Sequence, residues 1–228
     1  MIRKLLCVVA CLMGICTAFS KQFSPTTKWP YLFENFQEAL IYKESGEMAR
    51  IQKANLHLEY SSLHYIDGEN VITANTSGIL KIEMGGLTFI YMNGELVQLL
   101  LSKNACALVK RVKIDQRVLR SSSGQGAYGM STDVSATKKL RSLQTNGVFN
   151  MNYAQMKVER EDGVAVNLVT DYFFLLEDGK TIIKATKRNV EKKLSHAGKA
   201  RLKAFVKQNK IKWKNEDSLK RLLNFFQQ

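Results

Sequence analysis

Proline and cysteine are scarce in this sequence. The only prolines are Pro25 and Pro30, and the only cysteine after residue 16 is Cys106. One cysteine cannot form an internal disulfide, so a disulfide framework is excluded and a hydrophobic core has to hold the fold. The chain is long enough for this, because a domain of its size buries roughly 70% of the unfolded surface. Cys106 alternates with Leu108, and we expect a small buried side chain rather than a nucleophile.

Long apolar runs are missing after residue 20, so the remaining chain is not expected to cross a bilayer as a helix. Residues 1–20 differ: two basic residues precede an apolar stretch at 5–16, and the small residues Ala18 and Ser20 follow. This order is typical of a secretory signal peptide, and an apolar helix of about 18 Å is too short for a hydrocarbon core of about 30 Å. The sequence therefore predicts export, with cleavage after Ser20 and a periplasmic or envelope-associated location. A lipobox ending at Cys11 is the less favoured alternative.

The pattern of residues 36–119 predicts β-structure. Apolar side chains alternate with polar ones, as at Leu56, Leu58 and Tyr60, which places the apolar set on one face of a sheet. We expect an antiparallel meander of about six to eight strands, closed like a barrel or packed as a sandwich. Glycine-containing turn signals separate the strands at Ser45-Gly46, Asp67-Gly68, Ser77-Gly78, Gly85-Gly86 and Asn93-Gly94.

Residues 121–146 are rich in serine, glycine, threonine and basic side chains, which predicts a long loop. Strands are expected again at 155–161, 166–176 and 180–185, with the hairpin turn Glu177-Asp178-Gly179-Lys180 between the last two. These strands need partners, so we expect them to complete the first sheet. The predicted β domain therefore spans residues 36–186.

The apolar period changes from 2 to 3.6 after residue 187, which predicts two or three short helices over 187–228. Ser195 and Asn215 are expected N-caps, the latter followed by Glu216 and Asp217 in the first helical turn. The apolar stripes of these helices need a surface, most simply the β domain. The predicted fold class is thus α+β, mainly β, with an extended leader at 21–35.

Positive charge is concentrated in one segment. The whole chain has a formal net charge of +14, and residues 184–221 alone contain 14 basic and three acidic residues. The simpler interpretation of this charge is a solvated face that keeps a helical region soluble. The alternative is contact with an anionic envelope surface or an acidic protein partner, to which each basic residue near the surface contributes about 1 kcal/mol. The residues predicted to make this contact are Lys199, Arg201, Lys203, Lys207, Lys210, Lys212 and Lys214.

Nucleic acid is a poor candidate for that partner. Lysines outnumber arginines by eleven to three in residues 184–221, and only Phe205 and Trp213 supply aromatic rings there. Base stacking and bidentate base recognition both require more aromatic and arginine side chains. We therefore expect no nucleic-acid binding.

No group of residues supports a catalytic, cofactor or metal assignment. Residues 124–129 match G-x-G-x-x-G, but they follow no strand and open no helix, so we interpret them as part of a loop. His57 and His64 could meet across a hairpin near Glu59, yet both are expected on an exposed sheet face or turn. His196 lies beside a helix cap. The acids Asp67, Asp171, Glu177 and Asp178 are interpreted as hairpin-end residues.

An aromatic cluster precedes the first strand. It consists of Trp29-Pro30-Tyr31-Leu32-Phe33 and Phe36. We expect this segment to act as an edge strand or plug that seals the core. A ligand-facing aromatic patch is the alternative.

Three segments carry a resemblance to a known group of proteins. They are the aromatic stretch 29–33 with the following hairpin to Tyr60, the motif Gly126-Ala127-Tyr128-Gly129, and the ending that runs from Lys207 to Leu219. Together they resemble a set of uncharacterised exported proteins of Bacteroidetes-type bacteria, over most of the chain after the predicted signal peptide. The resemblance implies an envelope location and carries over no site residue.

These observations predict a non-enzymatic envelope protein with a binding or structural role. Its basic tail is expected to contact an anionic surface or partner. The alternative is a small-ligand binder or hydrolase that uses the mouth of the sheet under the 121–146 loop. The two hypotheses differ in where the ligand binds, on the outside of the tail or inside the sheet.

Overall fold

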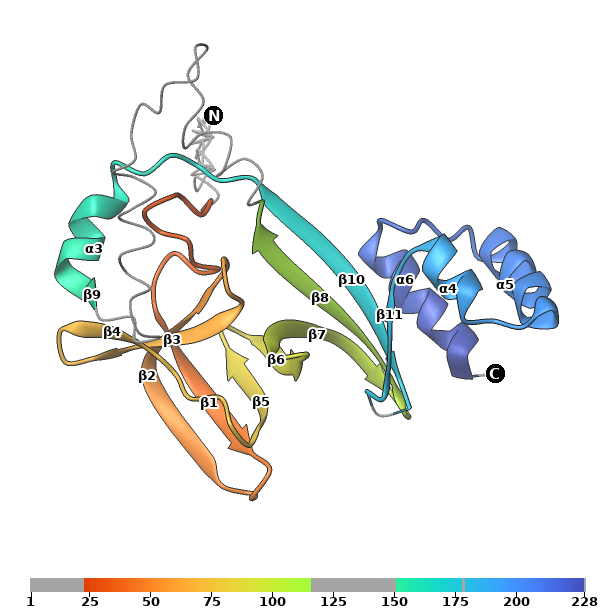
Figure 1. Ribbon diagram of the computed structural model, residues 1–228, viewed down its shortest axis with the longest axis horizontal. Helices are drawn as coiled ribbons and strands as arrows, with labels where there is room; N and C mark the ends of the chain where they lie inside the picture. The colour runs from red at the N-terminus through yellow and green to blue at the C-terminus, as the bar shows by residue number, and fades with distance from the viewer. Residues whose placement is uncertain (1–22, 116–150, 178, 228) are drawn as a thin grey trace, which may run out of the picture.

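A computed structural model describes residues 23–115, 151–177 and 179–227 (Figure 1). The predicted signal peptide, the 121–146 loop and the G-x-G-x-x-G match at 124–129 lie outside the described residues. None of the helices in the described ranges combines the length and the apolarity that crossing a bilayer requires.

The strands form one antiparallel sheet of eleven strands in the order β11-β10-β8-β7-β6-β5-β1-β2-β3-β4-β9. The sheet is strongly curled, with β1 to β6 wrapping round at one end and the long strands β7, β8 and β10 reaching towards the C-terminal helices (Figure 1). The strands are β1 (Gln37–Lys43), β2 (Met48–His57), β3 (Ser62–Asp67), β4 (Asn70–Thr73), β5 (Ile79–Met84), β6 (Leu87–Met92), β7 (Glu95–Lys103), β8 (Cys106–Ile114), β9 (Met151–Asn152), β10 (Leu168–Leu176) and β11 (Thr181–Lys184).

The mainly β class is confirmed, but the strand order departs from a simple meander. β5 pairs with β1 rather than with β4, so the chain crosses from one side of β1 to the other. The predicted turns are in place. The glycine that ends each two-residue turn signal has a positive φ, for example 57° at Gly68 and 79° at Gly94. β10 pairs with β8 and β11 with β10, so the later strands complete the first sheet as expected.

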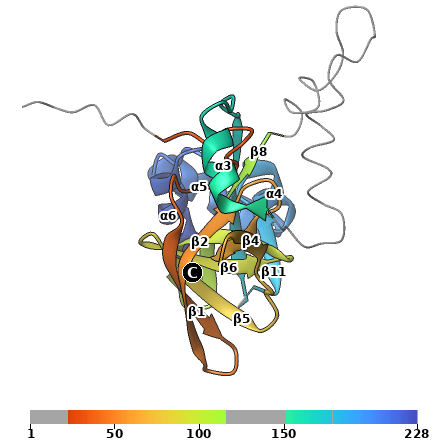
Figure 2. The same cartoon turned by 90° about the vertical axis from the view of Figure 1, so that its left-hand side faces the viewer.

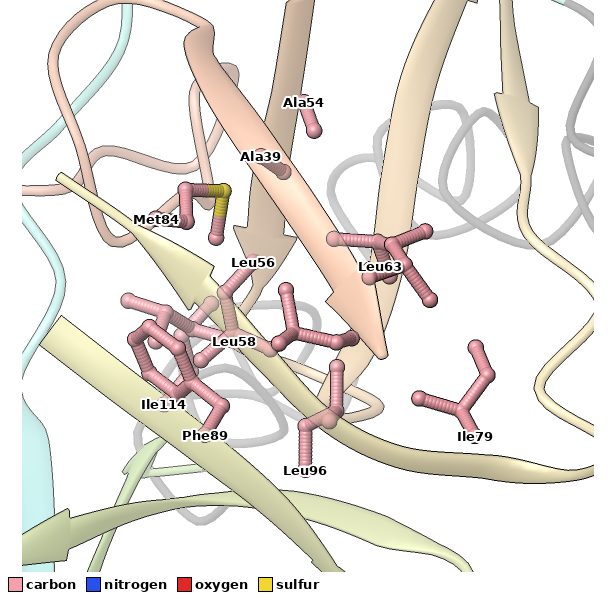
Figure 3. Close-up of a cluster of buried hydrophobic side chains, with 12 residues drawn as sticks. Ala39, Ala54, Leu56, Leu58, Leu63, Ile79, Met84, Phe89, Leu96 and Ile114 are labelled. Carbon is pink, nitrogen blue, oxygen red and sulfur yellow. The ribbon is translucent and has the colours of Figure 1, made fainter. Parts of the chain in front are cut away.

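The concave side of the curl holds the main hydrophobic core. Apolar side chains from β1, β2, β3, β5, β6, β7 and β8 converge there (Figure 3). Leu58, Leu63 and Phe89 are almost completely buried within this cluster. Burial of such side chains contributes about 1.5–3 kcal/mol each, so this cluster is a main source of stability. The alternating residues of the same strands point to the outer face.

One predicted strand is wrong. Residues 155–161 were expected in a strand, but the structure has α3 (Tyr153–Arg160) there. The Asn152 side chain caps this helix by accepting a hydrogen bond from the Gln155 amide at 3.1 Å. Met156 and Val158 alternate as in a strand, yet Met156 is buried and Val158 is 76% exposed. Capping and one buried methionine decide the structure here, against the period-2 pattern.

The chain ends in α4 (Lys187–Lys192), α5 (His196–Gln208), α6 (Glu216–Leu223) and the 3₁₀ turn η1 (Asn224–Gln227). We call residues 187–227 the cap. In Figure 1 the cap lies at one end of the sheet beside β10 and β11, and α3 lies at the opposite end beside β9. Figure 2, seen from that opposite end, shows α3 in front and the cap helices behind it.

Candidate functional site: the basic cap and a buried histidine layer

Two of the three helices of the cap, α5 and α6, begin at the N-caps that the sequence predicts. The Ser195 hydroxyl accepts a hydrogen bond from the Gly198 amide at 3.2 Å, and the Asn215 side chain accepts one from the Ser218 amide at 2.9 Å. Such caps satisfy amide groups that have no partner within the helix. Thr186 caps α4 in the same way, through the Asn189 amide. Both predicted N-caps are therefore confirmed.

An apolar interior fixes the cap to the sheet. Leu108, Phe174 and Ile183 contribute from β8, β10 and β11, and helical leucines cover them. The predicted helical stripes are the residues that face this interior. They are Leu202, Phe205 and Val206 from α5, and Leu219, Leu222, Leu223 and Phe226 from α6 and η1. Cys106 also packs against this cluster, but it is only partly buried, because it lies at the exposed start of β8.

The three acidic residues of the cap are all engaged in ion pairs. Glu216 lies 2.8 Å from Lys220 and 3.5 Å from Lys110 of β8. Partial burial alone would raise the pKa of Glu216. The hydrogen bond from Lys220 and the positive charges of Lys220 and Lys110 outweigh this effect and hold the pKa below its usual range. Glu191 pairs with Lys187, and Asp217 with Lys220, each at 3.9 Å. The cap therefore offers no acid to its remaining basic residues.

The seven basic residues predicted to contact an anionic surface are all exposed on the cap. Within the described ranges, none of the seven takes part in a salt bridge, while sheet residues such as Arg111 do. Arg201 lies over the Phe225 ring at 5.9 Å, which holds the stem of this side chain against the cap. The structure thus brings Lys199, Arg201, Lys203, Lys207, Lys210, Lys212 and Lys214 together on one small helical unit.

Three of these lysines form a row along α5. Lys199, Lys203 and Lys207 follow each other at intervals of four residues, next to the buried side of the helix marked by Leu202. Like charges at this spacing destabilise a helix by a few tenths of a kcal/mol per pair, and α5 contains no acid to offset them. We call these three residues the lysine row.

Lys210 continues the lysine row in an unusual backbone conformation. It follows the C-cap of α5 with a φ of 48°, in the left-handed region that favours glycine or asparagine. The next residue, Ile211, donates its amide to the Val206 carbonyl at 3.0 Å and is buried, which completes the helix stop. A lysine therefore occupies a position where glycine would be more stable. No local pattern indicates this helix stop, because lysine is not the usual residue at such a position.

The expectation that His57 and His64 are exposed is wrong. Both are 1% exposed, on the outer face of β2 and β3, where Tyr31 of the leader contacts both rings and Trp29 packs on Tyr31. The leader contributes to both faces of the sheet, because Trp29 and Tyr31 belong to the buried cluster on the outer face, while Leu32 and Phe33 pack against the main core as the expected plug would. Met156 of α3 belongs to the same buried cluster. We call His57, His64 and the side chains that contact them the histidine layer.

The two imidazoles of the histidine layer stack on each other. Their ring centroids are 4.7 Å apart and their planes differ by 18°. Tyr60 stacks on the other face of His57 at 5.4 Å, and the Tyr31 ring meets both histidines edge-on. The Tyr31 hydroxyl is 3.0 Å from Nδ1 of His64. On its other side, Nε2 of His64 lies 3.1 Å from the Ser62 hydroxyl and 3.2 Å from the Thr73 hydroxyl.

This environment favours neutral imidazoles. Burial lowers the pKa of His64 to about 4. Burial, together with repulsion from His64, lowers the pKa of His57 well below its ordinary value. Burial penalises the charged form of an imidazole, and two stacked imidazolium ions would also repel each other. The histidine layer is therefore built for uncharged rings near neutral pH.

Glu59 does not join the histidines as a metal ligand. Its carboxylate accepts a hydrogen bond from the Tyr60 hydroxyl at 2.9 Å instead. Among the described residues, no group of three or more His, Cys, Asp or Glu side chains is placed to hold a metal ion. His196 is the first residue of α5 and is exposed, far along the chain from the other two.

Asp171 is also not the hairpin-end residue that the sequence suggested. It lies inside β10 and forms salt bridges with Arg111 at 3.0 Å and with Lys184 at 2.6 Å. Although burial opposes the shift, hydrogen bonds from Lys184 and Arg111 hold the pKa of Asp171 below its usual range. Arg111 also pairs with Glu95 of β7 and lies over the Phe173 ring. We call Glu95, Arg111, Lys113, Asp171 and Lys184 the sheet ion network.

The fold and these sites define a class: a single curled antiparallel sheet that carries a basic three-helix cap. Comparison of the chain with protein-family models, with curated protein sequences and with solved structures gives no match. The resemblance to exported proteins of Bacteroidetes-type bacteria therefore stays a prediction.

Proposed function

We propose that this chain is a non-enzymatic binding protein of the cell envelope whose basic cap contacts an anionic surface or partner. One observation carries the proposal: the cap exposes seven basic side chains while its own acids are engaged in ion pairs. Residues 187–227 contain 13 basic and three acidic residues. A rigid unit with this charge attracts anions over about a Debye length, roughly 8–10 Å at physiological salt.

The envelope location in this proposal comes from residues 1–20 and from the resemblance. The alternative of a ligand inside the sheet mouth depends on the 121–146 loop. In the part of the chain that the structure describes, buried side chains such as Leu58 and Phe89 occupy the inside of the curl. This supports the outer surface of the cap as the binding surface.

Co-sedimentation of the full chain tests the proposal. The supports are phosphatidylglycerol-containing vesicles and beads coated with an acidic polysaccharide, each compared with its uncharged counterpart over a series of salt concentrations. We expect binding to at least one anionic support, and weaker binding as salt rises. The variant Lys203→Gln/Lys207→Gln should bind roughly 30-fold more weakly, because each basic residue near an anionic surface contributes about 1 kcal/mol.

A matched control removes the same charge from the sheet. Lys53 and Lys180 are exposed, and neither forms a salt bridge within the described ranges. The variant Lys53→Gln/Lys180→Gln should bind almost like the unaltered protein. Equal retention on charged and uncharged supports, or equal loss in both variants, would contradict a binding role for the cap.

A further inference from the structure

The arrangement of side chains on the cap surface, as well as its positive charge, favours one kind of anionic partner. Resting on the proposed function, we infer that the lysine row and Lys210 bind an extended acidic polysaccharide rather than a lipid bilayer. Three observations carry this inference: the absence of exposed large apolar side chains on the described cap, the spacing of the charges, and the backbone conformation at Lys210.

Surface binding to a bilayer uses apolar side chains as well as charge. An interfacial helix inserts tryptophan, phenylalanine or leucine below the headgroups, and its basic residues flank them. The large apolar side chains that are exposed in the described ranges belong to β2, the β2–β3 turn, β5, α3, the segment after α3 and the start of β10. None of them lies in residues 187–227. The aromatic rings Phe205, Trp213 and Phe226 instead pack against the interior of the cap.

The spacing of the lysine row fits a polyanion that carries one charged group on each sugar ring. Successive members of the row are four residues apart on α5, which is about 6 Å along a helix axis. A polyuronate carries one carboxylate on each sugar ring, and a pyranose ring is about as long as one helical turn.

Nucleic acid is disfavoured by the position of the aromatic rings. Sequence-independent binding of single strands uses exposed aromatic platforms on which bases stack. Phe205 and Trp213, the rings that could serve on the cap, are partly buried in its interior. Lysine in the row, unlike arginine, supplies a strongly hydrated point charge without a planar fork, which suits a flexible chain of separate anionic groups.

Lys210 extends the row at a cost to the local backbone. Its φ of 48° is unfavourable for a side chain with a Cβ atom, and glycine is the usual residue at this point of a helix stop. Departures from local rules of this kind are expected where a side chain has a functional role. Lys212 and Lys214 follow on the exposed side of the same connection to α6, so a long chain lying on α5 could reach them.

Titration of the full chain with sodium polygalacturonate tests the inference, measured by calorimetry at low salt. Phosphatidylglycerol vesicles and inorganic polyphosphate form the comparison arms. We expect saturable binding of polygalacturonate and weaker binding of the other two at equal concentration of charge. Polygalacturonate failing while vesicles bind would overturn this inference and leave the proposed function standing. Failure of every anion would remove both. Tighter binding of polyphosphate would overturn the assignment to a polysaccharide.

Two triple variants with equal net charge separate the row from general attraction. The row variant is Lys199→Gln/Lys203→Gln/Lys207→Gln, and the control is Arg188→Gln/Lys192→Gln/Lys193→Gln, three exposed residues of the cap outside the seven contact residues. Glutamine has nearly the helix propensity of lysine, so circular dichroism should show both variants folded. The row variant should lose on the order of 100-fold in affinity for polygalacturonate, and the control about tenfold or less. Equal losses would show that only net charge matters and would overturn the row as a binding site.

Discussion

The sheet and the cap differ in whether their basic side chains are paired with acids. In the sheet, Arg111 lies between Glu95 and Asp171, and Lys184 also reaches Asp171. The two sheet histidines are kept neutral by burial. In the cap, seven exposed basic side chains have no salt bridge within the described ranges. Arg111 and Lys184 are therefore part of the internal structure of the sheet, whereas the seven basic residues of the cap are left exposed to solvent.

This contrast separates stability from binding. Changes in the sheet should alter the free energy of unfolding and leave anion binding unchanged. Changes on the exposed face of the cap should do the reverse, because exposed lysines contribute little to stability. Three predictions test the contrast, and their expected effects on stability decrease in order.

The largest effect is expected from acidification of the histidine layer. The folded-state pKa of His64 is lowered to about 4, against about 6.5 in the unfolded chain, so the unfolded state binds more protons between these values. Stability is therefore full above about pH 6.5 and falls as the pH drops towards 4, by about 3 kcal/mol for His64 alone. Urea unfolding at a series of pH values measures this loss.

Two variants locate the titrating groups. His57→Phe keeps an aromatic ring in the stack and removes one ionisable group, so the loss of stability between pH 6.5 and 4.5 should become smaller. His196→Gln changes an exposed histidine and should leave the pH profile as it is. Asp171, Glu95 and Glu216 also have lowered pKa values, and their contribution is lost only at lower pH, below about 4. A profile that is flat above pH 4.5 in the unaltered protein would contradict a neutral histidine layer.

The burial of the histidines also shows where sequence reasoning stops. His57 and His64 stand at polar positions of an alternating pattern, which correctly places them on the outer face of the sheet. That face is covered by Trp29 and Tyr31, which lie more than 20 residues earlier in the chain. A period-2 pattern reports which face a side chain points to, but not what covers that face.

Local signals were reliable where neighbouring residues decide the structure. Gly68 and Gly94 mark turns because the backbone needs a positive φ there, and Ser195 and Asn215 begin helices because their side chains cap nearby amides. The seven basic residues of the candidate site were found from the clustering of charge. In contrast, the pairing of Lys110 with Glu216 joins positions 106 residues apart, and no local pattern indicates it. The prediction for residues 155–161 failed because Met156 and Val158 fit the period of a strand, whereas the Asn152 cap and the burial of Met156 alone decide for a helix.

The sheet ion network should give a smaller effect on stability than the histidine layer. Asp171→Asn removes the counter-charge of Arg111 and Lys184, and the Asp171 side chain is only 17% exposed. We expect a loss of about 1–2 kcal/mol in the free energy of unfolding at neutral pH, measured in urea, with unchanged anion binding. Glu38→Gln breaks the pair with Arg50, in which both side chains are exposed, and serves as the control with a smaller loss. A larger loss in the control would show that burial does not set the strength of these pairs.

The smallest effect on stability, and the sharpest comparison, is expected at Lys210. Lys210→Gly should raise the free energy of unfolding by up to about 1 kcal/mol, because glycine adopts a φ of 48° without the strain of a Cβ atom. The same variant should weaken binding to polygalacturonate, since it removes one charge at the end of the lysine row. Lys210→Gln removes the charge and keeps the strain, so binding should fall without a gain in stability.

Asn104→Gly, at a φ of 52°, is the conformational control, and its effect on stability should be small because asparagine tolerates this region. A destabilised Lys210→Gly variant would mean that the lysine side chain contributes to the structure of the cap, and the separation between a stabilising sheet and a binding cap would fail at this residue.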